Sequence, residues 1–248
     1  MVIREEFDRR ITEINLYFEI LKVIELDKPK LTAFDAVSDT NIDIIFDSQK
    51  INIFRASTFL LLYNLVESTV FNSVITIFDS INSDRHNPKL KYFDVIDDVK
   101  KYWLDNVYKH DEKMKKDAVI NNFIKLSNLI FNESLVLASY YIKYGGSLDA
   151  FKIQETAKSL GVNIDKLKDG YRKDIHGEAF KEVQQKRNWL AHGEKTFAEI
   201  GQDYPFGRLD EFRQYIVEHL EKFIISIDDY IRDASYKRSN VEEIAAVE

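Results

Sequence analysis

The distribution of glycine along this chain restricts its fold more than any other feature of the sequence. All eight glycines lie at or after Gly145, and the only prolines before that point are Pro29 and Pro88. Sandwiches, barrels and propellers need frequent turns, and such turns draw on glycine and proline. The first 144 residues therefore favour long helices, and they cannot contain a glycine-rich phosphate-binding loop.

Apolar residues recur at helical spacing in the longest segments. From Ile3 to Leu21 they return every three or four residues, which predicts an N-terminal helix of about 20 residues. A second, mostly buried helix is predicted over 51–81 and a last one over 209–236. Strand alternation is almost absent, and residues 29–50 are predicted to be loop with a short helix.

The second half of the chain is predicted to hold shorter helices that its glycines separate. The predicted segments are two or three helices within 93–144, with a helical apolar face continuing through 135–144; a helix over 149–160, ended by Gly161; loop with a short helical turn over 162–177; a helix over 177–191, stopped by Gly193; and loop over 193–207.

These patterns predict an all-α protein, a bundle of four main helices with short inserted helices. We expect one domain over 1–240, with a variable helix and loop in 1–50 and an irregular insert over 145–177. Residues 241–248 are expected to form a flexible tail.

Composition excludes several classes of site. The chain has no cysteine, so disulfide scaffolds, thiolate zinc sites and cysteine nucleophiles are excluded, and five histidines make a multi-histidine metal centre a poor fit. We expect no metal and no cofactor. The formal charge is 35 − 42 = −7, which argues against non-specific coating of DNA but permits a local basic patch for RNA.

The first ten residues lack the apolar core of a signal peptide, and no uncharged apolar run reaches the ~18 residues of a membrane span. We therefore expect a cytoplasmic protein that does not enter a membrane.

One stretch near the end of a predicted helix combines residues that could do chemistry. It reads Lys186-Arg187-Asn188-Trp189-Leu190-Ala191-His192-Gly193. At about 100° per residue, Arg187 falls on the apolar side of this helix, between Phe180 and Val183. Asn188 and His192 are four residues apart and share the neighbouring polar face.

A guanidinium on an apolar stripe needs an anion to offset its desolvation. One reading gives Arg187 an internal carboxylate, with Glu67 in the long second helix as the first candidate. The other reading gives it a bound phosphate. The spacing of Arg187 and His192 alone does not decide between them, because it recurs by chance.

The segment from Arg187 to Gly193 resembles the R-x4-H signature of the HEPN superfamily, and Asn188, directly after the arginine, fits its commoner form. HEPN proteins are all-helical bundles, and many are metal-independent endoribonucleases. The segment 63–67, Tyr-Asn-Leu-Val-Glu, resembles the Tyr-x-x-x-Glu element of stand-alone HEPN proteins of roughly this length.

Two further parts of the chain resemble the same branch. The turn 145–149 with the helix that ends at 160–162 resembles its insert, and the closing helix through Tyr230 and Tyr236 also fits. The resemblance covers about 50–236. The first 50 residues match only as a helix plus a variable segment.

The resemblance implies a chemistry for these residues. The 2′-hydroxyl of RNA attacks the adjacent phosphorus, which leaves a 2′,3′-cyclic phosphate and a 5′-hydroxyl. His192 would be the general acid and base, and Arg187 would bind the scissile phosphate. Asn188 would orient the phosphate or His192. Lys186, Lys195 and Glu67 complete the predicted substrate-binding set.

The side chains of Arg187 and His192 point ~140° apart on one helix. Two such helices that cross at a two-fold axis could supply both groups to one cleft, and the resemblance also implies a dimer of this kind. The predicted partners are RNA, an identical or paired HEPN chain, and an antitoxin or defence-system partner.

The predicted function is an endoribonuclease of a toxin-like or antiviral defence system. One alternative is a non-catalytic HEPN-like module that binds a nucleotide or a partner protein, with Arg187 merely paired to Glu67. A helical interaction protein with an accidental motif is a further alternative.

The remaining candidates have simpler explanations. His176 is expected to be exposed and inert, and His86, His110 and His219 to be surface or capping residues. Trp103 and Trp189 are expected to pack in the core or an interface. The candidate basic rim comprises Lys166, Lys168, Arg172 and Lys173, with Lys186 and Lys195.

Overall fold

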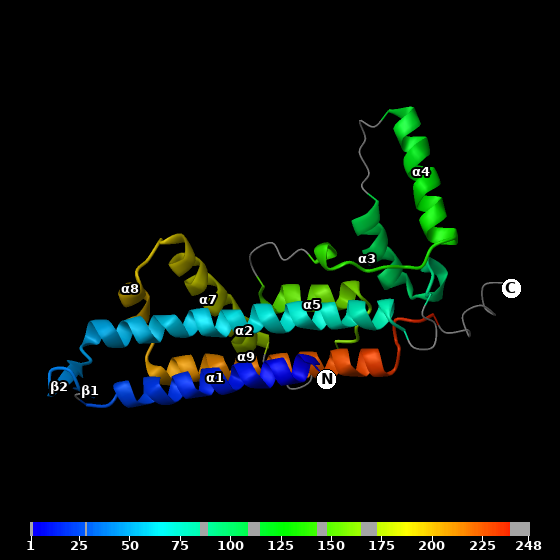
Figure 1. Cartoon of the computed structure of the whole chain (residues 1–248). Coiled ribbons are helices and arrows are strands. Elements are labelled where there is room, and N and C mark those ends of the chain that lie inside the picture. Colours follow the sequence, from blue (N-terminus) through cyan, green and yellow to red (C-terminus); the bar gives the residue numbers. More distant parts are fainter. Residues whose placement is uncertain are drawn as a thin grey trace. The chain divides into compact units, whose positions relative to one another are not determined.

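The computed structural model describes residues 2–27, 29–84, 89–108, 115–142, 148–164 and 173–238 (Figure 1). The regular secondary structure of this part of the chain is helical apart from one hairpin and an isolated β-bridge, so the prediction of an all-α fold is confirmed. The elements are α1 (Val2–Ile24), β1 (Lys30–Asp35), β2 (Thr40–Ile45), α2 (Ser48–Asn82), the 3-10 helix η1 (Tyr92–Asp94), α3 (Asp97–Val107), α4 (Lys116–Phe131), the 3-10 helix η2 (Ser139–Tyr141), α5 (Ala150–Ser159), α7 (Lys173–His192), α8 (Phe197–Gly201) and α9 (Phe206–Arg232).

The contacts divide the chain into two compact units with interleaved sequences. The first unit comprises 1–69, 147–150 and 171–221, and the second comprises 70–146, 151–170 and 222–248. Three helices, α2, α5 and α9, contribute residues to both units, α5 only through Ala150 in the first. The single domain over 1–240 stays a prediction.

The first unit is built around α1, the first part of α2 and the first part of α9. The predicted stripe of α1, from Ile3 to Leu21, is buried apart from Ile11, which is half-buried. Tyr17 Oη donates to the carbonyl oxygen of Phe54 at 2.6 Å, which ties α1 to α2. Arg213 Nη1 donates to Asn15 Oδ1 at 2.6 Å, which ties α9 to α1. These contacts form the frame on which α7 and α8 lie.

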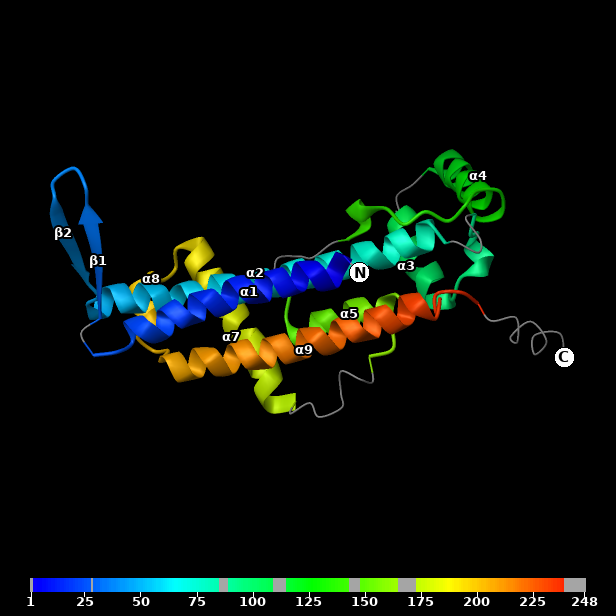
Figure 2. The ribbon, with the colours of Figure 1, turned by 60° about the horizontal axis from the view of Figure 1, so that its bottom comes forward.

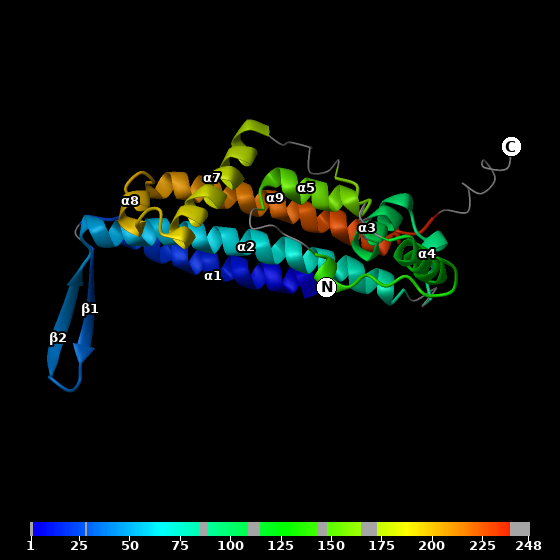
Figure 3. The ribbon, with the colours of Figure 1, turned by 90° about the horizontal axis from the view of Figure 1, so that it is seen from above.

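The short helix α8 packs against the start of α2 at backbone distance (Figure 3). A Cβ on Gly201 would lie 1.9 Å from the carbonyl oxygen of Asn52, so only glycine fits there. Thr196 caps α8: its Oγ1 accepts from the backbone N–H of Glu199 at 3.3 Å, and the Glu199 carboxylate accepts from the backbone N–H of Thr196 at 2.7 Å. The prediction of plain loop over 193–207 was therefore wrong within 197–201.

The prediction of loop with a short helix over 29–50 was also wrong, because 30–45 forms an antiparallel hairpin (Figure 2). Its strands pair from Lys30 with Ile45 to Asp35 with Thr40, and Asp39 takes a positive φ of 50° in the turn. All residues of both strands except Asp35 are exposed. No face of the hairpin is buried, which explains why it lacks the alternation that marks a half-buried strand.

The second unit contains the last turns of α2 with α3, α4, α5 and the end of α9. Gly161 ends α5 with a φ of 78°, as predicted, and Tyr230 Oη donates to the carbonyl oxygen of Leu160 at 2.5 Å. The prediction that a helical apolar face continues through 135–144 was wrong within 135–138, which lie outside any helix. The Asn82 side chain hydrogen-bonds both backbone groups of Leu137. Its Nδ2 donates to the carbonyl oxygen at 2.8 Å, and its Oδ1 accepts from the N–H at 2.9 Å.

Four helical predictions are confirmed with shifted ends. The predicted helices 51–81, 149–160, 177–191 and 209–236 correspond to α2, α5, α7 and α9. Within α9, His219 is 1% exposed and its ring lies 5.0 Å from that of Phe180, so the expectation of a surface or capping histidine was wrong. It lies one residue before Leu220 on the apolar stripe and is part of the core.

Among the described helices, α2 alone has the length and composition of a membrane-crossing helix, with a window of mean hydropathy 1.4 of which 50% is buried inside the protein. Core helices of soluble proteins have the same character. The finding therefore does not assign α2 to a membrane.

Candidate functional site

Most of the candidate site residues lie on the C-terminal half of α7, in the first unit; Glu67 lies on α2, and Lys195 lies between α7 and α8. The apolar side of this helix is anchored by Phe180 and Val183, each 1% exposed, as the helical spacing predicts. The polar residues of the motif therefore face outward or towards α2. Lys186, Arg187, Asn188 and Trp189 are half-buried, and His192 is exposed.

Arg187 lies against α2, where two residues one turn apart receive it. Its Nη2 is 3.3 Å from Glu67 Oε1 and 3.4 Å from Oε2, and its Cζ lies 4.2 Å from the centre of the Tyr63 ring. Its Nη1 donates to Asn188 Oδ1 at 3.1 Å. The internal-carboxylate reading of Arg187 is therefore the arrangement in this structure.

The Tyr63 ring packs against the guanidinium of Arg187 and is itself held in place. It is 2% exposed, and its Oη accepts from the backbone N–H of Leu148 at 3.2 Å. Burial raises the pKa of Tyr63, and the negative charge of Glu67 adds to the rise. A neutral phenol with both its ring and its hydroxyl held supports the guanidinium from one side.

The pair of Arg187 and Glu67 remains open to solvent. The Arg187 side chain is 26% exposed and that of Glu67 is 41% exposed. An ion pair at such an exposed position is weak, so a phosphate could take the place of the carboxylate at modest cost.

His192 is the last residue of α7. Gly193 follows with a φ of 69°, and the N–H of Glu194 donates to the carbonyl oxygen of Trp189 at 2.9 Å, which closes the helix in a glycine-terminated turn. The imidazole is exposed, and within the described part of the chain it has no hydrogen-bond or ion-pair partner. It is thus accessible for proton transfer.

A second cluster surrounds Trp189. Lys186 Nζ lies 4.1 Å from the centre of this ring and Lys195 Nζ lies 4.5 Å from it. Lys186 also pairs with Glu182 at 3.1 Å, and Tyr204 Oη donates a short hydrogen bond to the same carboxylate. Two cations beside a half-buried indole form the kind of surface that contacts an RNA backbone and its bases.

The pKa of Glu182 results from opposing effects. Burial alone would raise it, but the hydrogen bond from Tyr204 and the ion pair with Lys186 outweigh burial and lower the pKa below its ordinary value. The pKa of Tyr204 is raised in turn by burial and by this carboxylate. Glu182 is therefore ionised at neutral pH and fixes Lys186 beside Trp189.

The sequence reasoning missed Glu182 and Tyr204. The position of Glu182, four residues before Lys186, was a detectable signal, because opposite charges at that spacing pair on a helix. Tyr204 gave no such signal, because it comes from the segment between α8 and α9.

Several candidates remain untested. His86, His110, Lys166, Lys168 and Arg172 lie outside the described residues, as do the side chains of Lys173 and His176. Trp103 is 4% exposed in the second unit, as expected of a core residue. The described ranges contain no group of three or more histidine, cysteine or carboxylate side chains that could hold a metal ion.

Comparison with known proteins gave one finding. The sequence model of the HEPN_MAE_28990-like HEPN family matches residues 2–236, which includes the first 50 residues that the motif comparison left open. Neither curated proteins nor solved structures gave a match.

Proposed function

Because the chain belongs to the HEPN_MAE_28990-like HEPN family, we propose that it is a metal-independent endoribonuclease of a toxin-like or antiviral defence system that acts in the cytoplasm. The observation that carries this proposal is the solvent exposure of two side chains on α7. An exposed imidazole ends the helix at His192, and a solvent-accessible guanidinium lies on the same helix at Arg187.

The proposed reaction needs one proton acceptor and one anion-binding group. His192 removes the proton from the 2′-hydroxyl, whose oxygen attacks the adjacent phosphorus and expels the 5′-oxygen of the next nucleotide. That leaving oxygen takes the proton that the imidazole of His192 removed, and the products carry a 2′,3′-cyclic phosphate and a 5′-hydroxyl. Arg187 neutralises the charge that develops on the phosphate oxygens.

Glu67 has a positioning role in this scheme. It holds the guanidinium of Arg187 over the Tyr63 ring before RNA arrives, at 3.3 Å from Nη2. The phosphate then displaces the carboxylate, while Asn188 keeps its bond to Nη1. Lys186 and Lys195, beside the Trp189 ring, bind the flanking backbone.

We further propose that two copies of α7 complete the site. Five residues along one helix separate the directions of Arg187 and His192 by ~140°. A two-fold axis would let Arg187 of one protomer and His192 of its partner act on one phosphate. The partner is an identical chain or a paired HEPN chain, and an antitoxin or trigger would regulate the assembly.

A second function, a non-catalytic binding module, is favoured by one observation. Glu67 already satisfies Arg187, as expected if the cation were only structural. The two functions differ in what Glu67→Gln should do. A nuclease that must displace the carboxylate should bind RNA more tightly without its charge, whereas loss of a purely structural pair should only lower stability.

The decisive experiment incubates the full chain with total RNA and transfer RNA in EDTA, beside His192→Ala and Arg187→Ala. We expect wild type to leave cyclic phosphate ends, His192→Ala to cleave at least about 100-fold more slowly, and Arg187→Ala to be impaired as strongly. Glu194→Ala, on the adjacent exposed turn, is the matched control and should cleave like wild type.

An intact dimer of wild-type protein with no cleavage of either RNA would favour the binding module. Equal cleavage by all four proteins would place the activity elsewhere. Unfolding curves for each variant separate loss of chemistry from loss of fold, and the exposure of His192 predicts that its variant melts like wild type.

A further inference from the structure

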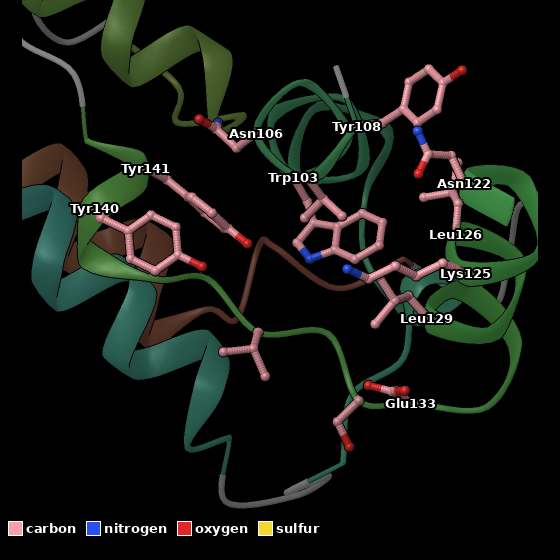
Figure 4. A pocket seen from close by; sticks show the side chains of 13 residues that line it. Trp103, Asn106, Tyr108, Asn122, Lys125, Leu126, Leu129, Glu133, Tyr140 and Tyr141 are labelled. Atoms are coloured by element: carbon pink, nitrogen blue, oxygen red, sulfur yellow. The ribbon is translucent and has the colours of Figure 1, made fainter. Parts of the chain in front are cut away.

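A cavity of about 570 Å³ lies in the second unit, and no step of the proposed nuclease reaction uses it (Figure 4). Its walls come from α3, from the inner face of α4 and from the segment 133–141. Pockets that hold small molecules in proteins measure about 300–1,000 Å³, so this space has a suitable size.

Aromatic rings form much of the wall. Trp103 lies on α3 and Tyr108 just after it, while Tyr140 and Tyr141 lie in η2. The Tyr140 and Tyr141 rings are in edge-to-face contact, with centres 4.8 Å apart. Such walls favour a flat ring, which can stack on or pack against the edges of these side chains.

Two hydrogen-bond donors at the cavity have no acceptor within the described part of the chain. One is the indole N–H of Trp103, a side chain that is 4% exposed, and the other is the ammonium of Lys125 on α4. Figure 4 shows both nitrogens directed into the space between α3, α4 and η2. Lys125 is exposed, and a cation beside a second N–H donor favours an anionic acceptor from outside.

Acceptors are present at the same cavity. Asn106 donates its amide N–H to the carbonyl oxygen of Tyr102 at 2.8 Å, so its own Oδ1 remains for a ligand. The Glu133 carboxylate lines the cavity and accepts from the Asn128 amide at 2.8 Å. One cation and one carboxylate therefore favour a ligand that carries an anionic group together with N–H donors.

We propose that this cavity binds a small aromatic molecule with an anionic group and N–H donors. The anionic group would bind Lys125 and the indole N–H of Trp103, and the ring would pack against Tyr140 and Tyr141. The N–H donors would face Asn106 and Glu133. Nucleoside monophosphates and aromatic amino acids share this chemistry.

The test titrates the full chain with guanosine 5′-monophosphate and, separately, with L-phenylalanine, by calorimetry. A parallel series measures tryptophan fluorescence in Trp189→Phe. The chain has two tryptophans, so in this variant the emission comes from Trp103 alone. We expect saturable binding of one probe and a matching change in Trp103 emission. The counterpart without the anion, guanosine or phenethylamine, should bind at least about tenfold more weakly.

Two variants locate the binding. Lys125→Met removes the charge of an exposed side chain and should weaken binding about tenfold, whereas Lys116→Met, on the same helix but outside the cavity, should bind like wild type. Trp103→Phe keeps a ring, removes the N–H and should also weaken binding. Absence of saturable binding for both probes, or equal affinity of Lys125→Met and wild type, would overturn the proposal.

Discussion

The C-terminal half of α7 and the helix α4 present two different kinds of surface. Near α7, the chain supplies its own counter-charges: Glu67 for Arg187 and Glu182 for Lys186. The next helix, α8, packs against α2 at backbone distance through Gly201. In α4, no residue is buried, and its Lys125 has no ion-pair partner within the described ranges.

The difference indicates how each surface meets a ligand. A site whose cations are already held costs little reorganisation when a phosphate arrives, which is what electrostatic catalysis requires. A helix with few buried contacts opens locally at low free energy and can adjust around a ligand. Preorganisation is thus expected at α7 and adaptation at α4.

The largest effect is expected from the packing of α8 against α2. Gly201→Ala places a Cβ 1.9 Å from the carbonyl oxygen of Asn52, and backbone cannot move aside cheaply, so the free energy of unfolding should fall by at least about 3 kcal/mol. Urea unfolding measures this. Gly207→Ala is the control, because a Cβ there meets nothing within 4 Å. A mild effect of Gly201→Ala would mean that α8 packs loosely too.

The ion pair of Arg187 with Glu67 should contribute less to the free energy of unfolding than the packing at Gly201. A double-mutant cycle with Arg187→Met and Glu67→Gln should give a coupling free energy of about 1 kcal/mol, since both side chains are partly exposed. The two single variants and the double variant are compared by urea unfolding. A coupling free energy near zero would show that Arg187 and Glu67 do not form a preorganised pair.

The Glu182 carboxylate should produce a smaller, pH-dependent effect. Its pKa is lowered in the folded state, so the unfolded chain binds more protons in acid. Its contribution to stability is therefore present above the unfolded pKa of about 4.3 and is lost as the pH falls through the folded pKa. Unfolding measured across this range should show a weaker acid dependence for Glu182→Gln than for wild type, while Glu194→Gln should follow wild type.

The smallest effect is expected on α4. Ile124 is 60% exposed, so Ile124→Ala should change the free energy of unfolding by no more than about 0.5 kcal/mol. The same substitution at Ile200 of α8, which is 2% exposed, should cost about 2–5 kcal/mol. Comparable losses at the two positions would show that α4 is packed as tightly as α8.

The main helices could be predicted from sequence because their buried faces repeat at helical spacing. The stripe from Ile3 to Leu21 required only that periodicity, and the glycine signals at Gly161 and Gly193 lie where α5 and α7 end. The hairpin could not be found in the same way, because an element with almost no buried face leaves no alternation in the sequence.

Of two other errors, only one had a signal in the sequence. Leu135 and Leu137 are buried while Val136 between them is exposed, but all three residues are apolar, so the sequence shows no alternation there. The segment from Thr196 to Glu199 carries the Thr-x-x-Glu pattern of a capped helix start, and α8 begins there.

The candidate site was predictable in part. The partner of Arg187 followed from the need to neutralise a half-buried cation, and Glu67 supplies it. The cavity beside α4 could not be predicted, since its walls come from three segments whose proximity depends on tertiary packing.

The interleaving of the two units limits how this chain can be altered by recombination. Each unit is assembled from three separate stretches of sequence, and α2 and α9 pass from one unit to the other at Thr69–Val70 and Glu221–Lys222. A single crossover between related genes therefore cannot exchange one unit whole, and it always joins halves of different ancestry. Such a gene should diverge by substitution along its whole length rather than by shuffling of modules.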